Sequence, residues 1–298
     1  MICMVWKLTQ NLKLCWKSEM NRFLNVACVQ TCSTTNVDEN IAASSAIIRE
    51  AAAKGAQLVT LPEVVNVCQR RGVLAKEAAR LEVEDLALAA YRELAKELKI
   101  WILIGSLAIK SKREDRLVNR SYLLNEFGSV VAHYDKIHMF DVVLPNGDSF
   151  KESESYRPGK RAVIANSPWG SIGLTVCYDV RFPYLYRALA QAGANILAVP
   201  SAFTRRTGSA HWHILLRSRA IETGSFVVAP AQCGDHEDGR KSFGHSLIVD
   251  PWGEVLADGG EEVGFVSAIL DLERVVEVRK MIPSLRHDRS LANLSSSP

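Results

Sequence analysis

The sequence lacks the features that mark membrane proteins, nucleic-acid-binding proteins and nucleotide-dependent enzymes. No apolar run approaches the roughly 20 residues that a membrane-spanning helix needs, so we expect no membrane partner. The formal net charge is +3 and the basic residues form no block, which argues against a nucleic-acid partner. The nucleotide-binding patterns GxGxxG, GxxxxGKS and GxxxxGKT are also absent.

A disulfide framework and a structural zinc site are excluded on similar grounds. The seven cysteines are odd in number and contain no CxxC pair, so we expect free thiols in a reducing compartment, the cytoplasm. Of the 298 residues, 48% are hydrophobic and 23% are charged, which is typical of a globular protein. A chain of this length buries roughly 75% of its unfolded surface and needs no disulfides for stability.

The amino-terminal residues differ in character from the rest of the chain. Lysines interrupt the apolar residues of positions 1–19, which offer no clear signal-peptide cleavage site, whereas Met20 precedes a cleaner start. We therefore expect a flexible extension over residues 1–19 and a single folded domain over residues 20–298. A weak transit peptide is the alternative for the first segment.

Hydrophobic periodicity predicts strands and helices in alternation, the pattern of an α/β protein. Apolar runs predict strands at residues 24–30, 57–61 and 101–109, and the second of these runs ends at Pro62. The helical period predicts helices at residues 37–54, after the cap Asn36, and at residues 83–98. Turn signals at residues 125–128, 167–170 and 250–253 predict antiparallel hairpins beside the parallel strands.

An internal repeat bears on the architecture. Residues 55–63 match residues 193–201 position by position, 138 residues later in the chain. Helix-ending Gly and strand-ending Pro are common enough in α/β proteins to explain such a match. The alternative is a pseudo-twofold fold in which two sheets face each other between outer helices. Glu63 and Ser201 would then lie at equivalent strand ends, where α/β sites usually form.

Cys177 is a candidate nucleophile. It ends an apolar strand that starts at Ser171 and precedes a helix that Pro183 opens, so its thiol lies at a strand-to-helix turn. Near a helix N-terminus a thiol loses its proton more readily, and backbone N–H groups can hold an oxyanion. A lone cysteine is more often a small core residue, the interpretation that we give to Cys28, Cys32, Cys68 and Cys233.

A nucleophilic thiol also needs a base. The histidines offer no clear partner, because His211 and His213 point about 200° apart on a helix. Glu63 is the better base, since it emerges from a buried apolar run, and partial desolvation would raise its pKa toward neutrality. Lys136 likewise follows a strand pattern, although any one Glu or Lys is usually a solvated surface residue. A carboxylate, an ammonium and a thiol at three strand ends form a candidate site.

These residues carry a family resemblance. The segments 61–63, 134–138 and 176–183 resemble, in order, the three signature segments of the nitrilase superfamily of carbon–nitrogen hydrolases, and the similarity extends from about Phe23 to Arg289. The carboxyl-terminal half resembles the amidase branch that includes deaminated-glutathione amidases, with matching segments at residues 200–203, 207–212, 217–222, 231–234 and 244–253. It departs from that branch at residues 205–206 and 142–151, which leaves the substrate open.

The resemblance implies a fold and a set of catalytic roles. The family fold is a four-layer α-β-β-α sandwich, and its chemistry needs no cofactor and no metal. Glu63 would be the general base and Cys177 the nucleophile, which forms a thioester and releases ammonia. Lys136 and the backbone N–H of Tyr178 would stabilise the oxyanion.

Further residues are expected around these groups. Glu152 resembles a second acidic residue that the family uses near the site, and Glu154 is its rival. Arg181 would bind a substrate carboxylate or pair with Asp179. Ser201 and Phe203 are further candidates for contact with the substrate.

The predicted activity is hydrolysis of a small linear amide, with a deaminated-glutathione-type amidase as the first hypothesis. A nitrilase, an ω-amidase or an N-carbamoyl hydrolase would use the same triad, and a catalytically silent binding protein is the alternative from another class. Family members commonly associate through helices after the catalytic cysteine, here residues 184–192 and 212–223, so we expect a homodimer or a higher homo-oligomer.

Overall fold

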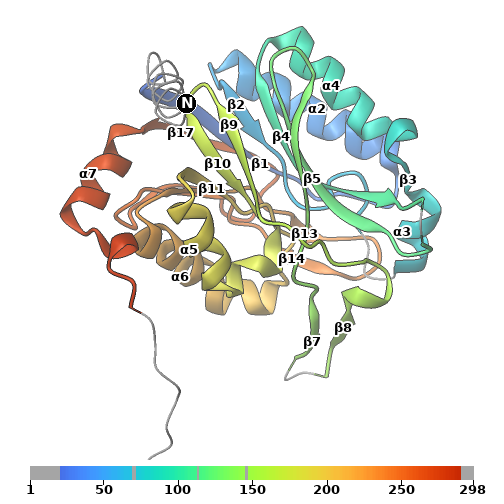
Figure 1. The fold of residues 1–298 in the computed structure, drawn as a ribbon. Coiled ribbons are helices and arrows are strands. Elements are labelled where there is room, and N and C mark those ends of the chain that lie inside the picture. The colour runs from blue at the N-terminus through green and yellow to red at the C-terminus, as the bar shows by residue number, and fades with distance from the viewer. Residues whose placement is uncertain (1–20, 69–71, 113, 145–146, 290–298) are drawn as a thin grey trace, which may run out of the picture.

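The computed structural model describes residues 21–68, 72–112, 114–144 and 147–289. The predicted extension over residues 1–19 lies outside the described residues. Figure 1 shows two large β-sheets that face each other, with helices on both outer sides. This arrangement is the four-layer α-β-β-α sandwich, and the predicted fold class is confirmed.

The first sheet is built mainly from the amino-terminal half of the chain. Its strands β1, β2 and β4 are parallel, and β5, β6 and β17 are antiparallel to their neighbours. The strand order is β17 (Gly264–Asp271), β1 (Phe23–Gln30), β2 (Leu58–Thr60), β4 (Trp101–Lys110), β5 (Val118–Leu124) and β6 (Val130–Asp135), with β3 (Arg80–Leu81) paired to β4. The helices on its outer side are α2 (Val37–Ala53) and α4 (Leu86–Leu98), and α3 (Gly72–Ala78) contacts β4.

The second sheet is built from the carboxyl-terminal half. Strands β10, β11 and β12 are parallel, and the other three are antiparallel to their neighbours. The order is β16 (Val255–Asp258), β15 (Leu247–Val249), β12 (Phe226–Ala229), β11 (Ala194–Ala198), β10 (Gly170–Leu174) and β9 (Val163–Ser167). Helices α5 (Pro183–Gln191) and α6 (Arg205–Thr223) cover its outer side, and α7 (Glu273–Met281) follows β17.

Shorter elements complete the chain. Two small hairpins pair β7 (Asp141–Val143) with β8 (Ser149–Lys151), and β13 (Cys233–Asp235) with β14 (Lys241–Phe243). The 3₁₀ turns are Glu82–Glu84, Glu152–Glu154, Cys177–Arg181 and Ser284–Arg286. In Figure 1 the β7–β8 hairpin projects from the lower end of the sandwich.

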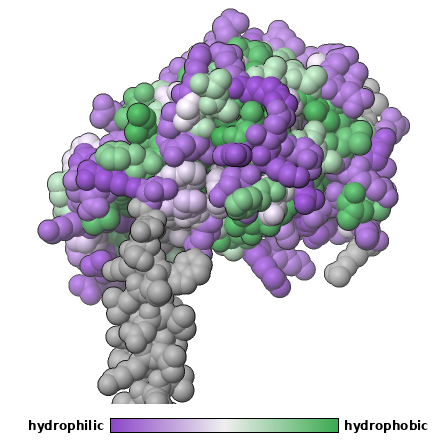
Figure 2. All heavy atoms as spheres, turned by 90° about the horizontal axis from the view of Figure 1, so that it is seen from above, coloured by the Kyte–Doolittle hydropathy of each residue, from purple (hydrophilic) through white to green (hydrophobic). Residues whose placement is uncertain are grey.

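Alternating side chains of the first sheet fill two separate cores. Val26 and Cys28 of β1 face the second sheet, whereas Ala27 and Val29 pack beneath α2 and α4. Because both faces of the sheet are covered, its parallel strands read as continuous apolar runs rather than as polar and apolar residues in alternation. The outer surface differs: the face drawn in Figure 2 is largely hydrophilic, with hydrophobic residues in separate groups.

The structure supports the internal repeat. The repeat segments form β2 and β11, and each of these strands is the middle one of three parallel strands. Gly55 and Gly193 precede them with φ of 88° and 109°, a left-handed conformation that favours glycine after a helix. Glu63 and Ser201 follow Pro62 and Pro200 at the matching ends, as predicted.

Several local predictions are also confirmed. The side chain of Asn36 caps α2 by accepting hydrogen bonds from two backbone N–H groups. The three predicted turns join β5 to β6, β9 to β10 and β15 to β16, and each pair is antiparallel. The predicted helix at residues 83–98 is interrupted, because Asp85 caps α4 and the residues before it form a 3₁₀ turn. Among the described residues, no helix is long and apolar enough to cross a membrane.

Candidate active site

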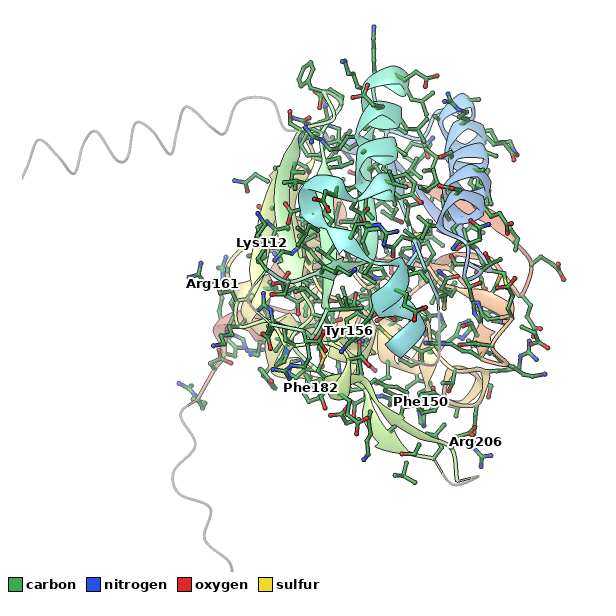
Figure 3. The ribbon with its side chains drawn as sticks, turned by 90° about the vertical axis from the view of Figure 1, so that its right-hand side faces the viewer. Lys112, Phe150, Tyr156, Arg161, Phe182 and Arg206 are labelled. Carbon is green, nitrogen blue, oxygen red and sulfur yellow. The ribbon has the colours of Figure 1, made fainter. Side chains whose placement is uncertain are left out.

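The three predicted reacting groups meet in one pocket of about 350 Å³. Glu63 follows β2, Lys136 directly follows β6, and Cys177 begins the 3₁₀ turn after β10. The β7–β8 hairpin contributes Phe150 to the wall, and Tyr156 lines the pocket nearby (Figure 3). The site therefore combines strand ends from both sheets.

The backbone at two of these strand ends is unusual. Cys177 has a φ of 51° and Val64, next to Glu63, has a φ of 46°, a left-handed conformation that non-glycine residues rarely adopt. The N–H of Cys177 donates to the carbonyl of Pro200 at 2.9 Å, which ties the turn to the end of β11. Such strained positions are typical of residues that a surrounding structure holds for function.

Lys136 lies between two carboxylates. Its Nζ is 2.8 Å from Oε1 of Glu63, and 2.9 and 2.8 Å from the two carboxylate oxygens of Glu152. The Lys136 side chain is 2% exposed, and those of Glu63 and Glu152 are 5% and 14% exposed. An ammonium has three N–H donors, so these contacts can occupy all of them.

Two neutral donors complete the surroundings of the Glu63 carboxylate. The side-chain amide of Asn119 donates to Oε1 at 2.9 Å, and to Glu152 at 3.2 Å. The backbone N–H of Ala202, just after Ser201, donates to the other oxygen of Glu63 at 2.9 Å. The two ends of the internal repeat are thus joined directly at the site.

The electrostatics of Glu63 differ from the prediction. Burial alone would raise the pKa of Glu63, but the positive charge of Lys136 and its hydrogen bond outweigh burial and lower this pKa below its usual value. The same attraction, together with that of Glu152, raises the pKa of Lys136 although burial opposes it. The predicted upward shift is wrong, because it considered desolvation without the buried cation.

The pKa of the Cys177 thiol also differs from the prediction, which expected the helix N-terminus after the turn to lower this pKa and favour the thiolate. Cys177 is only 7% exposed. Burial, then the negative charge of Glu63, raises the pKa of its thiol well above the usual range. The resting thiol is therefore protonated beside a charged carboxylate, and its proton must move as the sulfur attacks.

The other described cysteines fit their structural interpretation. Cys28, Cys68 and Cys233 are 0 to 1% exposed, and burial raises the pKa of each thiol to about 12. Cys32 is partly buried, and all five cysteines in the described part of the chain are free.

The structure distinguishes Glu152 from Glu154, the alternative candidate for the second acidic residue. Besides Lys136 and Asn119, the Glu152 carboxylate accepts the N–H of Phe140 at 2.7 Å. Glu154 also lines the pocket, but its side chain is 67% exposed and pairs with Lys151. Glu152 is therefore the carboxylate that contacts the candidate catalytic residues.

The predicted substrate contacts are only partly brought together. Phe203 and Tyr178 line the pocket, whereas Arg181 and Ser201 do not. Arg181 lies over the rings of Tyr178 and Phe203, with centroid distances of 5.8 and 5.4 Å. The hydroxyl of Ser201 is fully buried and donates to the carbonyl of Val199.

Asp179 is engaged elsewhere. Its carboxylate accepts hydrogen bonds from the hydroxyl of Tyr134 at 2.7 Å, from the N–H of Val176 at 2.9 Å and from the N–H of His138 at 3.0 Å. These contacts tie the turn after β10 to the end of β6. Arg181 instead approaches Nδ1 of His211 at 3.3 Å.

The pocket residues that the sequence analysis did not single out include two with polar groups inside the site, Asn119 of β5 and Arg240 of the β13–β14 turn. Arg240 donates to the carbonyl of Ala202, and its buried Nε has no hydrogen-bond partner among the described residues. Neither residue belongs to a signature segment. No local signal singled out Asn119, because it is one of three consecutive polar residues in β5, with Arg120 and Ser121.

With this geometry in place, comparison with known proteins defines the class. A model of the carbon–nitrogen hydrolase family matches residues 25–280. The chain belongs to the carbon–nitrogen hydrolase family and is a hydrolase of carbon–nitrogen bonds other than peptide bonds.

Individual proteins of this family are similar to the chain over most of its length. The deaminated glutathione amidase of Bos taurus is 42% identical over 271 residues, which cover 89% of this chain and 81% of that protein. The enzyme of the same name from Synechocystis sp. is 39% identical, with 88% and 96% covered. The crystal structure of the C. elegans NitFhit protein gives a TM-score of 0.85 at 36% identity. That match covers 90% of this chain and 66% of that chain, slightly less than two thirds of its length.

Glu152 should be required for turnover and Glu154 should not. We expect Glu152→Gln to keep the fold and lose about 10- to 100-fold in kcat, because Lys136 loses one charged partner worth about 1.5–3 kcal/mol. Glu154→Gln is the matched control and should stay within about twofold of wild type. Steady-state kinetics and circular dichroism would measure both variants. Equal activity of the two variants would contradict the role of Glu152.

Proposed function

We propose that this chain hydrolyses a small linear amide to an acid and ammonia, through a thioester on Cys177. Family membership supports the reaction class. The single observation that carries the residue assignment is the contact of the Lys136 ammonium with the Glu63 carboxylate in the pocket that Cys177 also lines. The proposal needs no cofactor and no metal, because side chains supply the nucleophile, the base and the oxyanion stabiliser.

In the first step the sulfur of Cys177 attacks the amide carbon while its proton moves to Glu63. Both groups line the same pocket, and the thiol lies close enough to the carboxylate for the charge of Glu63 to raise its pKa, which supports this path. The carbonyl electron pair moves to oxygen and forms a tetrahedral oxyanion. Glu63 then gives the proton to the amide nitrogen, the carbon–nitrogen bond breaks and ammonia leaves.

Lys136 and the backbone N–H of Tyr178 stabilise the oxyanion. One such donor contributes about 2.7–4 kcal/mol to the transition state. Because three carboxylate oxygens lie within 2.9 Å of the Lys136 ammonium, the oxyanion takes the place of one oxygen of Glu152. Glu152 thus acts as a positioning residue for Lys136.

In the second half of the reaction, water attacks the thioester. Glu63 accepts a proton from the water, the carbon–sulfur bond breaks, and the acid leaves. The proton returns to the sulfur of Cys177, which restores the resting thiol. Because the Glu63 carboxylate is charged, it can accept a proton from Cys177 in the first step and from water in the second.

Arg240 supports an amide substrate that carries a carboxylate. Its guanidinium lines the pocket, and its buried Nε has no partner among the described residues. An unpaired buried donor on a cation is costly unless a ligand satisfies it, and guanidinium binds carboxylates in a planar, bidentate way. Together with the relatives that are named deaminated glutathione amidase, this favours a deaminated-glutathione-type substrate.

Three related activities share the triad and compete with this assignment. A nitrilase, an ω-amidase and an N-carbamoyl hydrolase differ in the substrate that fits the pocket. A catalytically silent binding protein is the alternative of another class, which the ion pair of Glu63 and Lys136 beside a protonated Cys177 does not favour. A silent protein would show no turnover with any amide or nitrile.

The thioester is tested with Cys177→Ala and its matched control Cys233→Ala, which changes a buried cysteine outside the pocket. Each protein is incubated with deaminated glutathione, α-ketoglutaramate and a simple nitrile, and acyl adducts and products are followed by mass spectrometry. We expect adduct formation or turnover in wild type and Cys233→Ala, and neither in Cys177→Ala, because Cys177 is the only thiol among the described residues that line the pocket. Turnover by Cys177→Ala would contradict the mechanism.

The role of Arg240 is tested with two amides of equal length, one with a terminal carboxylate and one neutral. Arg240→Gln should lower kcat/KM for the carboxylate amide about 10- to 100-fold and leave the neutral amide nearly unchanged, since a charge-assisted bond contributes about 1.5–3 kcal/mol. Arg181→Gln is the comparison variant. A larger loss in that variant would return the role to Arg181.

A homodimer through α5 and α6 is also part of the proposal. Large apolar side chains are exposed on these helices: Tyr184 is 65%, Ile214 68% and Ile221 54% exposed. Burial of such side chains in an interface removes apolar surface from water. In a dilution series, we expect light scattering of wild type to give twice the 33.0 kDa chain mass. The Ile214→Glu variant should give one chain mass. The control Val83→Glu changes an exposed residue on another face; a wild type at the chain mass throughout would refute the dimer.

We place this enzyme in the cytoplasm. The free thiols of the described cysteines support a reducing compartment. Cell fractionation with an antibody to the chain would test this location, and recovery in an oxidising compartment would contradict it.

A further inference from the structure

His213, His245 and Asp258 form a second group of chemically active side chains. His213 lies on α6, His245 lies between β14 and β15, and Asp258 ends β16. None of the three lines the active-site pocket. Their possible ligand atoms all lie within 4.8 Å of one another.

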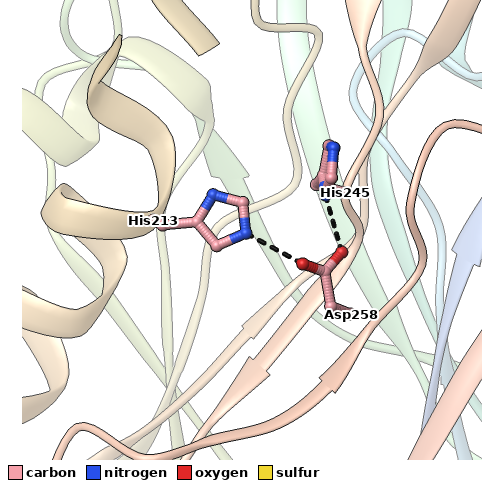
Figure 4. A group of neighbouring side chains, drawn as sticks. All are labelled: His213, His245 and Asp258. Atoms are coloured by element: carbon pink, nitrogen blue, oxygen red, sulfur yellow. Dashed lines mark hydrogen bonds and ion pairs between the residues drawn. The ribbon is translucent and has the colours of Figure 1, made fainter. Parts of the chain in front are cut away.

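The two imidazole rings are directed at one carboxylate, as Figure 4 shows. Nε2 of His213 is 2.9 Å from one oxygen of Asp258, and Nδ1 of His245 is 2.8 Å from the other. One nitrogen of each ring and both oxygens therefore meet in a single small space. Two imidazoles and one carboxylate are a ligand set that zinc and similar divalent transition-metal ions bind in proteins.

We propose that His213, His245 and Asp258 bind one divalent transition-metal ion of the zinc type, with water at the remaining coordination position. Each neutral ring would bind the ion through the lone pair of the nitrogen that faces Asp258 and carry its proton on its other nitrogen, so no net proton is released, and one oxygen of Asp258 would serve as the third ligand. Metal bonds of about 2.0–2.2 Å in a tetrahedral arrangement set the ligand atoms roughly 3.3 Å apart.

The required movements are small. The two contacts of Asp258 are already shorter than that spacing, and the largest separation of 4.8 Å would close by about 1.5 Å. The side chains are 22 to 36% exposed, so an ion can enter from solvent and the Asp258 carboxylate can adjust to it.

The backbone holds His245 in place for this role. Its φ is 56°, a conformation that is costly for a non-glycine residue. The backbone carbonyl of His245 accepts the indole N–H of the buried Trp212 at 2.8 Å, and the backbone N–H of His245 donates to the carbonyl of Gly260. The N–H of Gly260 donates in turn to the Asp258 carboxylate at 3.0 Å. Ordered partners of this kind orient metal ligands in known sites.

Ring packing fixes the histidines further. The ring of His245 stacks on Phe243 at a centroid distance of 4.5 Å, and the ring of His213 is 5.1 Å from that of His245 at 72°. An ion here would join helix α6 to the edge strand of the second sheet. It would therefore stabilise the sandwich rather than take part in the hydrolysis.

The experiment measures Zn²⁺ binding to the full chain after treatment with a chelator, in competition with a chromogenic chelator. We expect wild type to bind one ion at this site and both His213→Gln and Asp258→Asn to bind it at least tenfold more weakly. His211→Gln is the matched control on the same helix and should bind like wild type. Amidase activity and circular dichroism serve as the check that each variant is folded.

A second probe separates this site from the thiols. Co²⁺ bound at His213, His245 and Asp258 should give visible absorption without a thiolate-to-metal band, and His213→Gln should lose it. Equal Zn²⁺ affinity in wild type, His213→Gln and Asp258→Asn would overturn the proposal. A Co²⁺ spectrum that comes only from thiolate ligation would overturn it as well. Neither result bears on the amidase mechanism, which uses no residue of this cluster.

Discussion

A single buried ammonium is the interaction on which the catalytic centre depends. Lys136 is 2% exposed, and its single positive charge attracts both Glu63 and Glu152, which approach it from the end of β2 and from the turn after β8. Removal of the ammonium would leave two buried carboxylates without compensation, and removing one partner from a buried ion pair typically costs about 3–5 kcal/mol. The ion pairs therefore fix the relative positions of the strand ends and keep Glu63 charged beside a protonated thiol.

Much of this arrangement could be predicted from local sequence. Glu63, Lys136 and Cys177 each follow a strand pattern that the residues themselves reveal, and short signature segments surround them. The internal repeat around Gly55 and Gly193 is consistent with two facing sheets, although helix-ending Gly and strand-ending Pro alone could also explain it. The strand patterns and signature segments are local and the repeat is a match of sequence, so neither tertiary geometry nor charge coupling is needed to find them.

The electrostatics and the rest of the pocket could not be predicted in this way. The pKa of Glu63 depends on Lys136, 73 residues away in the chain, and the pKa of Cys177 depends in turn on Glu63. Asn119 and Arg240 reach the pocket from hairpins whose direction no local pattern gives. The His213 and Asp258 pair is likewise the product of tertiary packing, since nothing near either residue indicates the other.

The pairing of β1 with β17 has a consequence for how the protein is made. These strands are the first and the last of the described sheets, and residues 23 to 30 pair with residues 264 to 271. During synthesis the first strand must wait for nearly the whole chain before its antiparallel neighbour emerges. Contacts of such long sequence separation slow folding. An unpaired edge strand also invites association with other chains, so β1 is most open to wrong pairing until residues 264 to 271 have emerged.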